Sequence, residues 1–214
     1  MNQKIYTIGH SNHSIETFIA LLKQHQITAL ADVRSHPYSK RLPHFSKASL
    51  KASLLEAEIT YVFLGKELGA RPNNPLCYVD SKALYEKIAE TEEFDAGIQR
   101  LIKGGETYKI ALMCAEKDPI TCHRAILVCQ NLREHFSIQH ILSNGELEPH
   151  QQLEERLLTN HGLSDQQITA PKQLSLFDEI NIREFSSENL SLEARLKEAY
   201  HRQGNQIAYQ DENT

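Results

Sequence analysis

Short apolar runs alternate with segments of helical periodicity along the first two thirds of the chain. Runs rich in β-branched and aromatic residues predict five buried strands, at 4–9, 27–33, 59–64, 108–114 and 137–142. Apolar residues three or four positions apart predict helices that begin at Ser14, run from Ser46 to Ala57, run from Lys82 to Lys103 with a break at Glu92–Glu93, and run from about Asp118 to His135. Segment 65–80 holds two glycines and two prolines and predicts a long loop.

This alternation of strand and helix predicts an α/β fold, with a mostly parallel sheet of about five strands and helices on both faces. The pattern changes after about residue 145. Residues 149–162 and 186–203 predict helices, and 163–179 has the composition of a linker. We therefore expect an α/β domain over 1–148 and a helical and linker tail over 149–214.

Composition narrows the class of protein. A hydrophobic content of 40% is enough for a core, and four cysteines are too few and too irregularly spaced for a disulfide scaffold. No apolar run reaches the roughly 18 residues of a membrane span, and the first residues lack the apolar stretch of a signal peptide. A cytoplasmic location is the expectation that follows.

Charge is distributed unevenly. Residues 1–150 carry equal numbers of basic and acidic side chains, so the net charge of −5 comes from the tail. Within the neutral part, the stretch from 33 to 55 holds no acidic residue. Its basic side chains are Arg34, Lys40, Arg41, Lys47 and Lys51, with His36 and His44 beside them. Such a stretch predicts a basic face that attracts phosphate groups, and an ordinary solvated surface is the alternative.

Polar residues follow three of the predicted strands. They are Gly9-His10-Ser11, Asp32-Val33-Arg34 and Cys114-Ala115-Glu116. Because the carboxyl ends of parallel strands meet at one edge of a sheet, where ligands bind in this class of fold, we expect these residues to share one site.

The segment "CAEKDPITCHR" (114–124) carries the densest chemistry. Asp118-Pro119 is a favourable helix start, which would place Cys122 near the first turn, where the helix dipole stabilises a thiolate. Cys122 is therefore the candidate nucleophile, with Glu116 or His123 moving protons. The alternative is a packed cysteine, in an apolar stripe with Ala125, Ile126 and Cys129.

The remaining site residues have paired interpretations. His10 follows a strand-end glycine and is either catalytic or an ordinary surface histidine. Asp32 and Arg34 point to one side of a strand, so they form either a structural ion pair or one that orients Arg34 toward a phosphate. The residues expected to bind an anion or nucleic acid are Ser11, Asp32, Arg34, Arg41 and Arg124.

A metal site is the less favoured interpretation of the same segment. Cys114, Cys122 and His123 are zinc-ligand types, but their spacing fits no closed zinc site and a fourth ligand is not evident. Cys114 ends an apolar strand and is expected to be a buried small hydrophobe. No cofactor is therefore expected.

Three motifs together resemble the domain of unknown function DUF488. They are "YTIGHS" (6–11), "DVRSHPYS" (32–39) and "CAEKDPITCHR" (114–124), followed by "IQHIL", and the likeness covers about residues 4–145. The resemblance implies a compact α/β fold with a site at these motifs, and it implies no particular reaction.

Two looser resemblances add alternatives. "ITCHRA" (120–125) is similar to the Cys-His-Arg core of alkylguanine-DNA alkyltransferases, although Thr121 replaces the family's proline. The order Asp-Val-Arg, then strand and cysteine, is similar to that of rhodanese-like domains, without their expected loop after the cysteine. These resemblances keep small-molecule sulfur or phosphoryl transfer open.

The tail contains "QLSLF", which resembles the peptide by which polymerases and repair proteins bind the replication sliding clamp. Gln173 would make polar contacts, and Leu174, Leu176 and Phe177 would anchor in an apolar pocket. We therefore expect a protein that processes DNA or nucleotides and is tethered to the clamp. A non-catalytic adaptor that binds phosphate or nucleic acid is the competing hypothesis.

Overall fold

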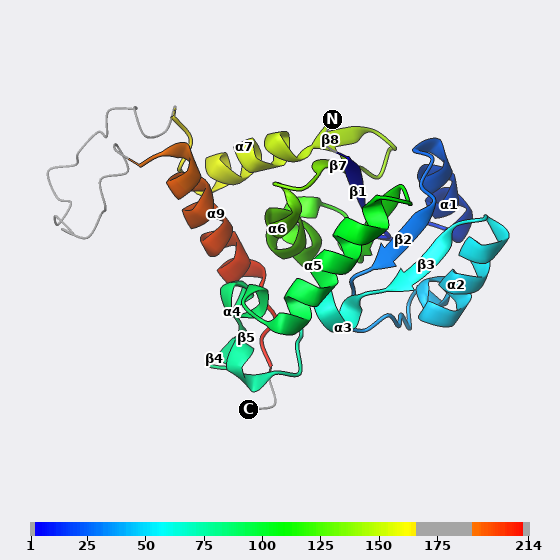
Figure 1. Ribbon diagram of the computed structural model, residues 1–214, viewed down its shortest axis with the longest axis horizontal. Helices are drawn as coiled ribbons and strands as arrows, with labels where there is room; N and C mark the ends of the chain where they lie inside the picture. Colours follow the sequence, from blue (N-terminus) through cyan, green and yellow to red (C-terminus); the bar gives the residue numbers. More distant parts are fainter. Residues whose placement is uncertain (1–2, 166–189, 212–214) are drawn as a thin grey trace, which may run out of the picture.

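The computed structural model describes residues 3–165 and 190–211, and its centre is a six-stranded sheet (Figure 1). The strand order is β3-β2-β6-β1-β7-β8, with every neighbouring pair parallel except β7 and β8. The strands are β1 (Lys4–Gly9), β2 (Ala29–Asp32), β3 (Thr60–Phe63), β6 (Ile110–Cys114), β7 (Ser137–Ile141) and β8 (Leu147–Pro149). The expected α/β class and all five expected strands are confirmed, and β8 is an additional edge strand.

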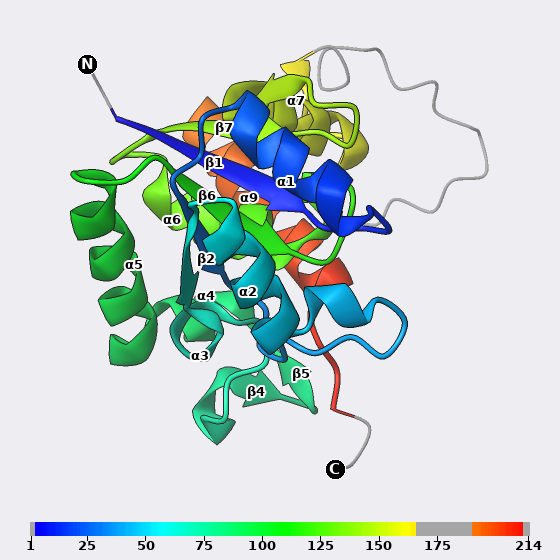
Figure 2. The ribbon, with the colours of Figure 1, turned by 90° about the vertical axis from the view of Figure 1, so that its right-hand side faces the viewer.

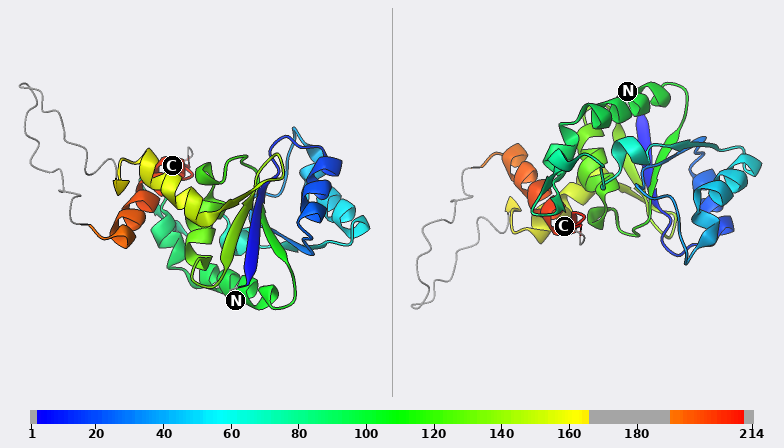
Figure 3. Two further views of the ribbon diagram at one scale, coloured as in Figure 1. Left: turned by 90° about the horizontal axis from the view of Figure 1, so that it is seen from above. Right: turned by 90° about the horizontal axis from the view of Figure 1, so that it is seen from below.

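Both faces of the sheet are buried, which explains why its central strands have continuous apolar runs rather than alternating ones. In β6, Leu112 and Cys114 belong to one hydrophobic cluster, whereas Ala111 and Met113 belong to the other. The sheet is thus the middle layer of three, with helices on either side (Figure 3).

The two helical layers differ in size. Helices α1 (Ile15–Gln24) and α2 (Lys47–Glu56) cover one face. The other face is covered by α5 (Glu92–Gly105), α6 (Gln130–Leu132), α7 (His150–Asn160) and α9 (Leu192–Ile207) (Figure 1). None of the helices in the described residues is long and apolar enough to span a membrane.

Two helix starts agree with the sequence and one differs in detail. The Ser14 hydroxyl caps α1 by accepting a hydrogen bond from the Thr17 amide. The Thr91 hydroxyl caps α5 by accepting from the Phe94 amide, and this new helix start is the expected break after α4 (Tyr85–Ala89). Ser46 stands before α2, but its hydroxyl bonds the backbone of Ser39 instead of capping the helix.

Two expectations need correction. Segment 65–80 is not a plain loop, because it contains α3 (Gly65–Leu68), the 3₁₀ turn η2 (Pro75–Cys77) and β4 (Tyr78–Val79), which pairs with β5 (Lys82–Ala83). The helix expected from Asp118 begins later. Asp118 caps only a 3₁₀ turn, η3 (Pro119–Thr121), and a π-helical segment, η4 (Arg124–Cys129), then leads into α6.

The tail packs on the sheet as part of one core. Leu153 and Leu157 of α7, with Leu196 and Tyr200 of α9, join the same cluster as the strands. The chain beyond α9 reaches β5, where the Ala83 amide donates to the Tyr209 carbonyl at 2.9 Å (Figure 2). The expected domain boundary at 148 falls inside β8. Whether the two sides of this boundary are separate domains stays a prediction.

Candidate functional site

Three parallel strands end side by side at the candidate site. Gly9 ends β1, Asp32 ends β2 and Cys114 ends β6, with β6 between the other two. A Cβ atom at position 9 would lie 1.9 Å from the Glu116 carbonyl oxygen, so only glycine lets the loop after β6 pass this closely. The edge expected from the strand pattern is therefore where the polar residues gather.

Arg124 holds this loop in place. Its side chain is completely buried, and its two Nη atoms donate to the Glu116 carbonyl at 2.8 Å and the Lys117 carbonyl at 3.3 Å. Its Nε donates to the Thr7 hydroxyl at 3.4 Å. All of these donors point to protein atoms, so Arg124 is placed to position the loop. The expected contact between Arg124 and an anion stays a prediction that this placement does not support.

Cys122 stands at the start of the helical segment. Its backbone is extended, its carbonyl accepts from the Ile126 amide at 3.1 Å, and its Sγ lies 3.5 Å from the Arg124 amide nitrogen. This N-cap geometry places the sulfur at the positive end of the helix. Burial alone would raise the pKa of Cys122, but the interaction with Cys114 and the charge of Arg124 lower it well below the usual range.

Cys122 and Glu116 share one proton. The distance between Cys122 Sγ and Glu116 Oε2 is 2.9 Å, too short for a thiolate and a carboxylate that both lack a proton. Glu116 as a residue is exposed, but its carboxyl group turns back among protein atoms, and this burial followed by the charge of Cys122 raises the pKa of Glu116. One negative charge spread over this pair balances the buried Arg124 guanidinium.

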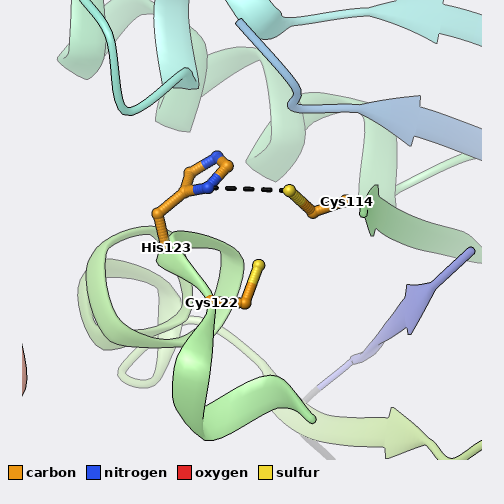
Figure 4. A group of neighbouring side chains, drawn as sticks. All are labelled: Cys114, Cys122 and His123. Atoms are coloured by element: carbon orange, nitrogen blue, oxygen red, sulfur yellow. Dashed lines mark hydrogen bonds between the residues drawn. The ribbon is translucent and has the colours of Figure 1, made fainter. Parts of the chain in front are cut away.

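Cys114 and His123 form a thiol–imidazole pair. The distance between Cys114 Sγ and His123 Nδ1 is 3.6 Å, and His123 Nε2 lies 3.0 Å from the Val33 carbonyl oxygen (Figure 4). Because a carbonyl only accepts, Nε2 carries the hydrogen and a neutral ring presents the Nδ1 lone pair to the thiol. Burial is the largest single influence on the pKa of His123 and lowers it, but the hydrogen bond with Cys122 and the charges of Cys122 and Glu116 together raise it above its usual value. For Cys114, the hydrogen bond with Cys122 and burial raise the pKa of the thiol.

A cleft of about 340 Å³ opens beside this pair. Cys114, His123 and Glu116 line it, whereas the Cys122 side chain lies behind the wall and is 1% exposed. Two cations face the cleft, Arg34 and Arg71. The other lining residues are Ser35, His36, Tyr38, Ala70, Tyr85, Ala115, Thr121, Ile207 and Tyr209.

Arg34 is held by the expected ion pair with Asp32. Nε and Nη2 of Arg34 lie 2.9 and 2.7 Å from the two carboxylate oxygens, and Nη2 also donates to the Phe45 carbonyl at 2.9 Å. The Tyr61 hydroxyl donates to the same carboxylate at 2.8 Å. The pair is therefore structural, and it also fixes the Arg34 guanidinium at the cleft wall. Both expected roles of the Asp32–Arg34 pair agree with this geometry.

His10 and Ser11 lie at the same edge of the sheet but not among the residues that line the cleft. The His10 ring stacks on Phe45 with 4.4 Å between centroids, and its Nδ1 lies 3.0 Å from the Ser11 carbonyl oxygen. Burial, followed by the charge of Arg34, lowers the pKa of His10 to about 4. Ser11 has a positive φ of 46° and donates to Asn12 at 3.3 Å. His10 is therefore placed as a neutral packed ring.

The expected basic face is only partly at the cleft. Lys40, Arg41, Lys47 and Lys51 are exposed, but Arg41 is not among the lining residues. The expected partner-binding residues Gln173, Leu174, Leu176 and Phe177 lie outside the described residues.

The far wall of the cleft carries residues that the sequence pattern did not indicate. Arg71 lies in the segment expected to be a loop, and its guanidinium stacks over the Tyr209 ring, 4.2 Å from the centroid. Tyr209 and Ile207 come from the tail. No periodic pattern in the sequence marks Arg71, Ile207 or Tyr209 as site residues. Tyr38, which also lines the cleft, could have been predicted, because it belongs to the "DVRSHPYS" motif.

The comparisons with known proteins give one result. The model of a family described as "Domain of unknown function DUF488" matches residues 14–130, more than half of the chain. The second and third motifs fall inside the matched range, whereas "YTIGHS" precedes it. No curated protein and no solved structure matches the chain.

Proposed function

The chain belongs to the DUF488 family, and for this member we propose an enzyme that binds a phosphate-bearing substrate, a nucleotide or a nucleic-acid end, and acts on it with the Cys114 thiol. One observation carries the proposal: the thiol–imidazole pair of Cys114 and His123 faces the same cleft as Arg34 and Arg71. A nucleophile beside a base that a third group orients is the arrangement that thiol-dependent enzymes use.

The roles follow from the distances. Cys114 Sγ attacks an electrophilic centre of the substrate, and its proton passes to His123 Nδ1, which the Val33 carbonyl keeps aligned. The protonated imidazole then gives that proton to the leaving group as the old bond breaks. This proposal moves the nucleophile from Cys122 to Cys114, because only Cys114 lines the cleft.

Arg71 is the better candidate to hold a phosphate. Arg34 is already neutralised by Asp32, whereas Arg71 is exposed and its planar group is stacked on Tyr209, which leaves the in-plane donors available. The exposed basic residues Lys40, Arg41, Lys47 and Lys51 do not line the cleft, but they support a polyanion such as nucleic acid as substrate.

Selective alkylation tests the proposal. In metal-free, reduced protein at pH 7.5, iodoacetamide should modify Cys114 about tenfold faster than Cys129, which is fully buried away from the cleft and has no base beside it. Pyrophosphate and nucleoside monophosphates should slow the reaction. Arg71→Ala should remove this protection, and Arg41→Ala, an exposed arginine that does not line the cleft, should keep it. Equal modification of Cys114 and Cys129 would remove the enzyme proposal.

A non-catalytic adaptor is the second candidate, favoured by the low exposure of the Cys114 side chain, 3%. An adaptor predicts that phosphate ligands bind while the thiol stays unreactive. The same alkylation series separates the enzyme from the adaptor. In an enzyme, iodoacetamide modifies Cys114 and phosphate ligands slow this reaction, whereas in an adaptor Cys114 is not modified with or without ligand.

Tethering to the sliding clamp is a separate part of the proposal and rests on the sequence of residues 173–177 alone. Purified clamp should retain the wild-type protein and lose the Leu176→Ala/Phe177→Ala double variant. Leu174→Ala should weaken retention less. Equal retention of all three proteins would remove the tether without affecting the cleft.

A further inference from the structure

Two thiols and an imidazole converge at the end of β6. Cys114 Sγ, Cys122 Sγ and one ring nitrogen of His123 all lie within 4.8 Å of one another, and all three residues are buried (Figure 4). We infer that these three side chains bind one Zn²⁺ ion, with the fourth coordination position open to the cleft. This goes beyond the proposed function, which uses the metal-free thiol.

The distances suit zinc. Tetrahedral zinc with Zn–S near 2.3 Å and Zn–N near 2.0–2.1 Å separates a sulfur from a nitrogen ligand by about 3.6 Å. The distance between Cys114 Sγ and His123 Nδ1 is 3.6 Å. The pair therefore needs little rearrangement to share an ion.

The surroundings already orient the ligands. His123 Nε2 is bonded to the Val33 carbonyl at 3.0 Å, so the ring offers Nδ1, which is the support that metal-binding histidines generally have. The Arg124 amide lies 3.5 Å from Cys122 Sγ, and N–H groups of this kind stabilise a bound thiolate.

Charge also balances when the ion is bound. Each sulfur forms a Zn–S bond and releases any proton it carries to solvent, so two thiolates neutralise the divalent ion. Glu116 keeps the proton of its pair with Cys122 and donates it to the bound sulfur at 2.9 Å, so this contact stays favourable. Two sulfur ligands and one nitrogen select a soft ion such as Zn²⁺ over Mg²⁺ or Ca²⁺.

Three protein ligands with one open position is the arrangement of a reactive zinc site rather than a closed structural one. Cys114 and His123 line the cleft, so the open position faces Arg34 and Arg71. Coordination draws charge from a thiolate sulfur, so zinc-bound Cys114 is a weaker nucleophile than the free thiolate. Zinc therefore switches the site between a metal-bound form with less reactive thiols and a metal-free form with a free Cys114.

Metal titration tests the inference on the full chain. Reduced protein freed of metal by a chelator should bind one Zn²⁺ per chain in competition with a chelating dye. Cys114→Ser and Cys122→Ser should each weaken binding by roughly 100-fold or more. Cys129→Ser is the matched control, because Cys129 is a buried cysteine of the same helical segment outside the cluster, and it should bind as wild type does.

Loading the wild-type protein with Co²⁺ in place of Zn²⁺ provides a test that does not depend on whether the cysteine variants fold. Wild-type protein loaded with Co²⁺ should show the charge-transfer absorption of thiolate ligands and the visible bands of tetrahedral cobalt. Absence of both, or unchanged zinc binding in the double variant Cys114→Ser/Cys122→Ser, would overturn the site.

The two proposals fail separately. If zinc does not bind but Cys114 of metal-free protein still reacts selectively with iodoacetamide, the zinc site is wrong and the thiol function stands. If zinc binds but the metal-free thiol is unreactive, the thiol function is wrong and the metal site stands. If both are right, one equivalent of Zn²⁺ should slow the alkylation of Cys114.

Discussion

His140 Nε2 lies 3.0 Å from His150 Nδ1, so two buried imidazoles join strand β7 to helix α7. The contact is the centre of a longer chain, since the Thr7 hydroxyl lies 2.8 Å from His140 Nδ1 and the Tyr200 hydroxyl lies 3.0 Å from His150 Nε2. Sheet, α7 and α9 are thus connected through side chains whose central contact requires at least one neutral ring, because two protonated imidazoles would point N–H groups at each other.

Acid should destabilise the fold through this pair. Burial, followed by the charge of Arg133, lowers the pKa of His150 to about 4, and burial followed by His150 lowers that of His140 well below its usual value. The unfolded chain takes up protons below about pH 6.5, so this stability is complete above that pH and is lost as the pH falls toward 4. The charged or titratable groups around the pair are Arg124, Arg133, Glu154, Arg156 and Tyr200.

The measurement is the free energy of unfolding in urea at pH 7.5 and pH 5.0. We expect His150→Gln to lose about 2 kcal/mol less between these two pH values than wild type does. His135→Gln changes an exposed histidine and should keep the wild-type pH dependence. Identical pH dependence in His150→Gln and wild type would show that the pair does not control acid stability.

Gly9→Ala should disrupt the site by a steric clash. The new methyl group would lie 1.9 Å from the Glu116 carbonyl oxygen, which belongs to backbone and cannot swing away. We expect a loss of roughly 1–3 kcal/mol in the free energy of unfolding. Gly104→Ala, in the last turn of α5 and near only the flexible tip of Ile110, should be neutral or slightly stabilising. Thermal melting compares the two variants, and equal melting temperatures would contradict the close approach.

Asp32→Asn should cost far more than the loss of a surface ion pair. It leaves the buried Arg34 guanidinium without a countercharge, which typically costs about 3–5 kcal/mol. Glu198→Gln breaks the exposed pair with Arg202 and should cost less than about 1 kcal/mol. Urea unfolding of both variants at pH 7.5 measures the contrast. A similar small loss in each would mean that Arg34 finds another partner.

Tyr209→Ala should weaken phosphate binding without affecting the thiol pair. The Tyr209 ring supports the Arg71 guanidinium, and a cation–π contact of this exposure contributes about 0.5–1 kcal/mol, or two- to fivefold in affinity. Tyr209→Phe keeps the ring and should bind within twofold of wild type. Protection of Cys114 from iodoacetamide by pyrophosphate provides the measurement, and equal protection in the alanine variant would remove Tyr209 from the site.

The sequence predicted the parts of the site that local patterns encode. Strand ends and a strand-end glycine are visible as short motifs, so the meeting of Gly9, Asp32 and Cys114 at one edge could be inferred before any coordinates. Which cysteine faces the cleft could not be inferred, because that depends on where the helical segment begins. Asp118 caps a 3₁₀ turn, so Cys122 becomes a cap behind the wall and Cys114 reaches the cleft.

The far wall was out of reach for a different reason. Arg71 and Tyr209 are separated by most of the chain and meet through the pairing of the tail with β5. Such long-range contacts leave no periodic signal in either segment. The tail was expected to be a separate unit on its charge and composition, which describe its surface but not the apolar side it packs against the sheet.

One wall of the cleft begins at Arg34, and the opposite wall is completed by Ile207 and Tyr209, which come much later along the chain. During synthesis the amino-terminal part emerges from the ribosome first, and it can build most of the sheet while the rest is still being translated. The cleft is completed only after Tyr209 has been made, so a chain that stops before this residue would carry both thiols without the enclosure that shields them.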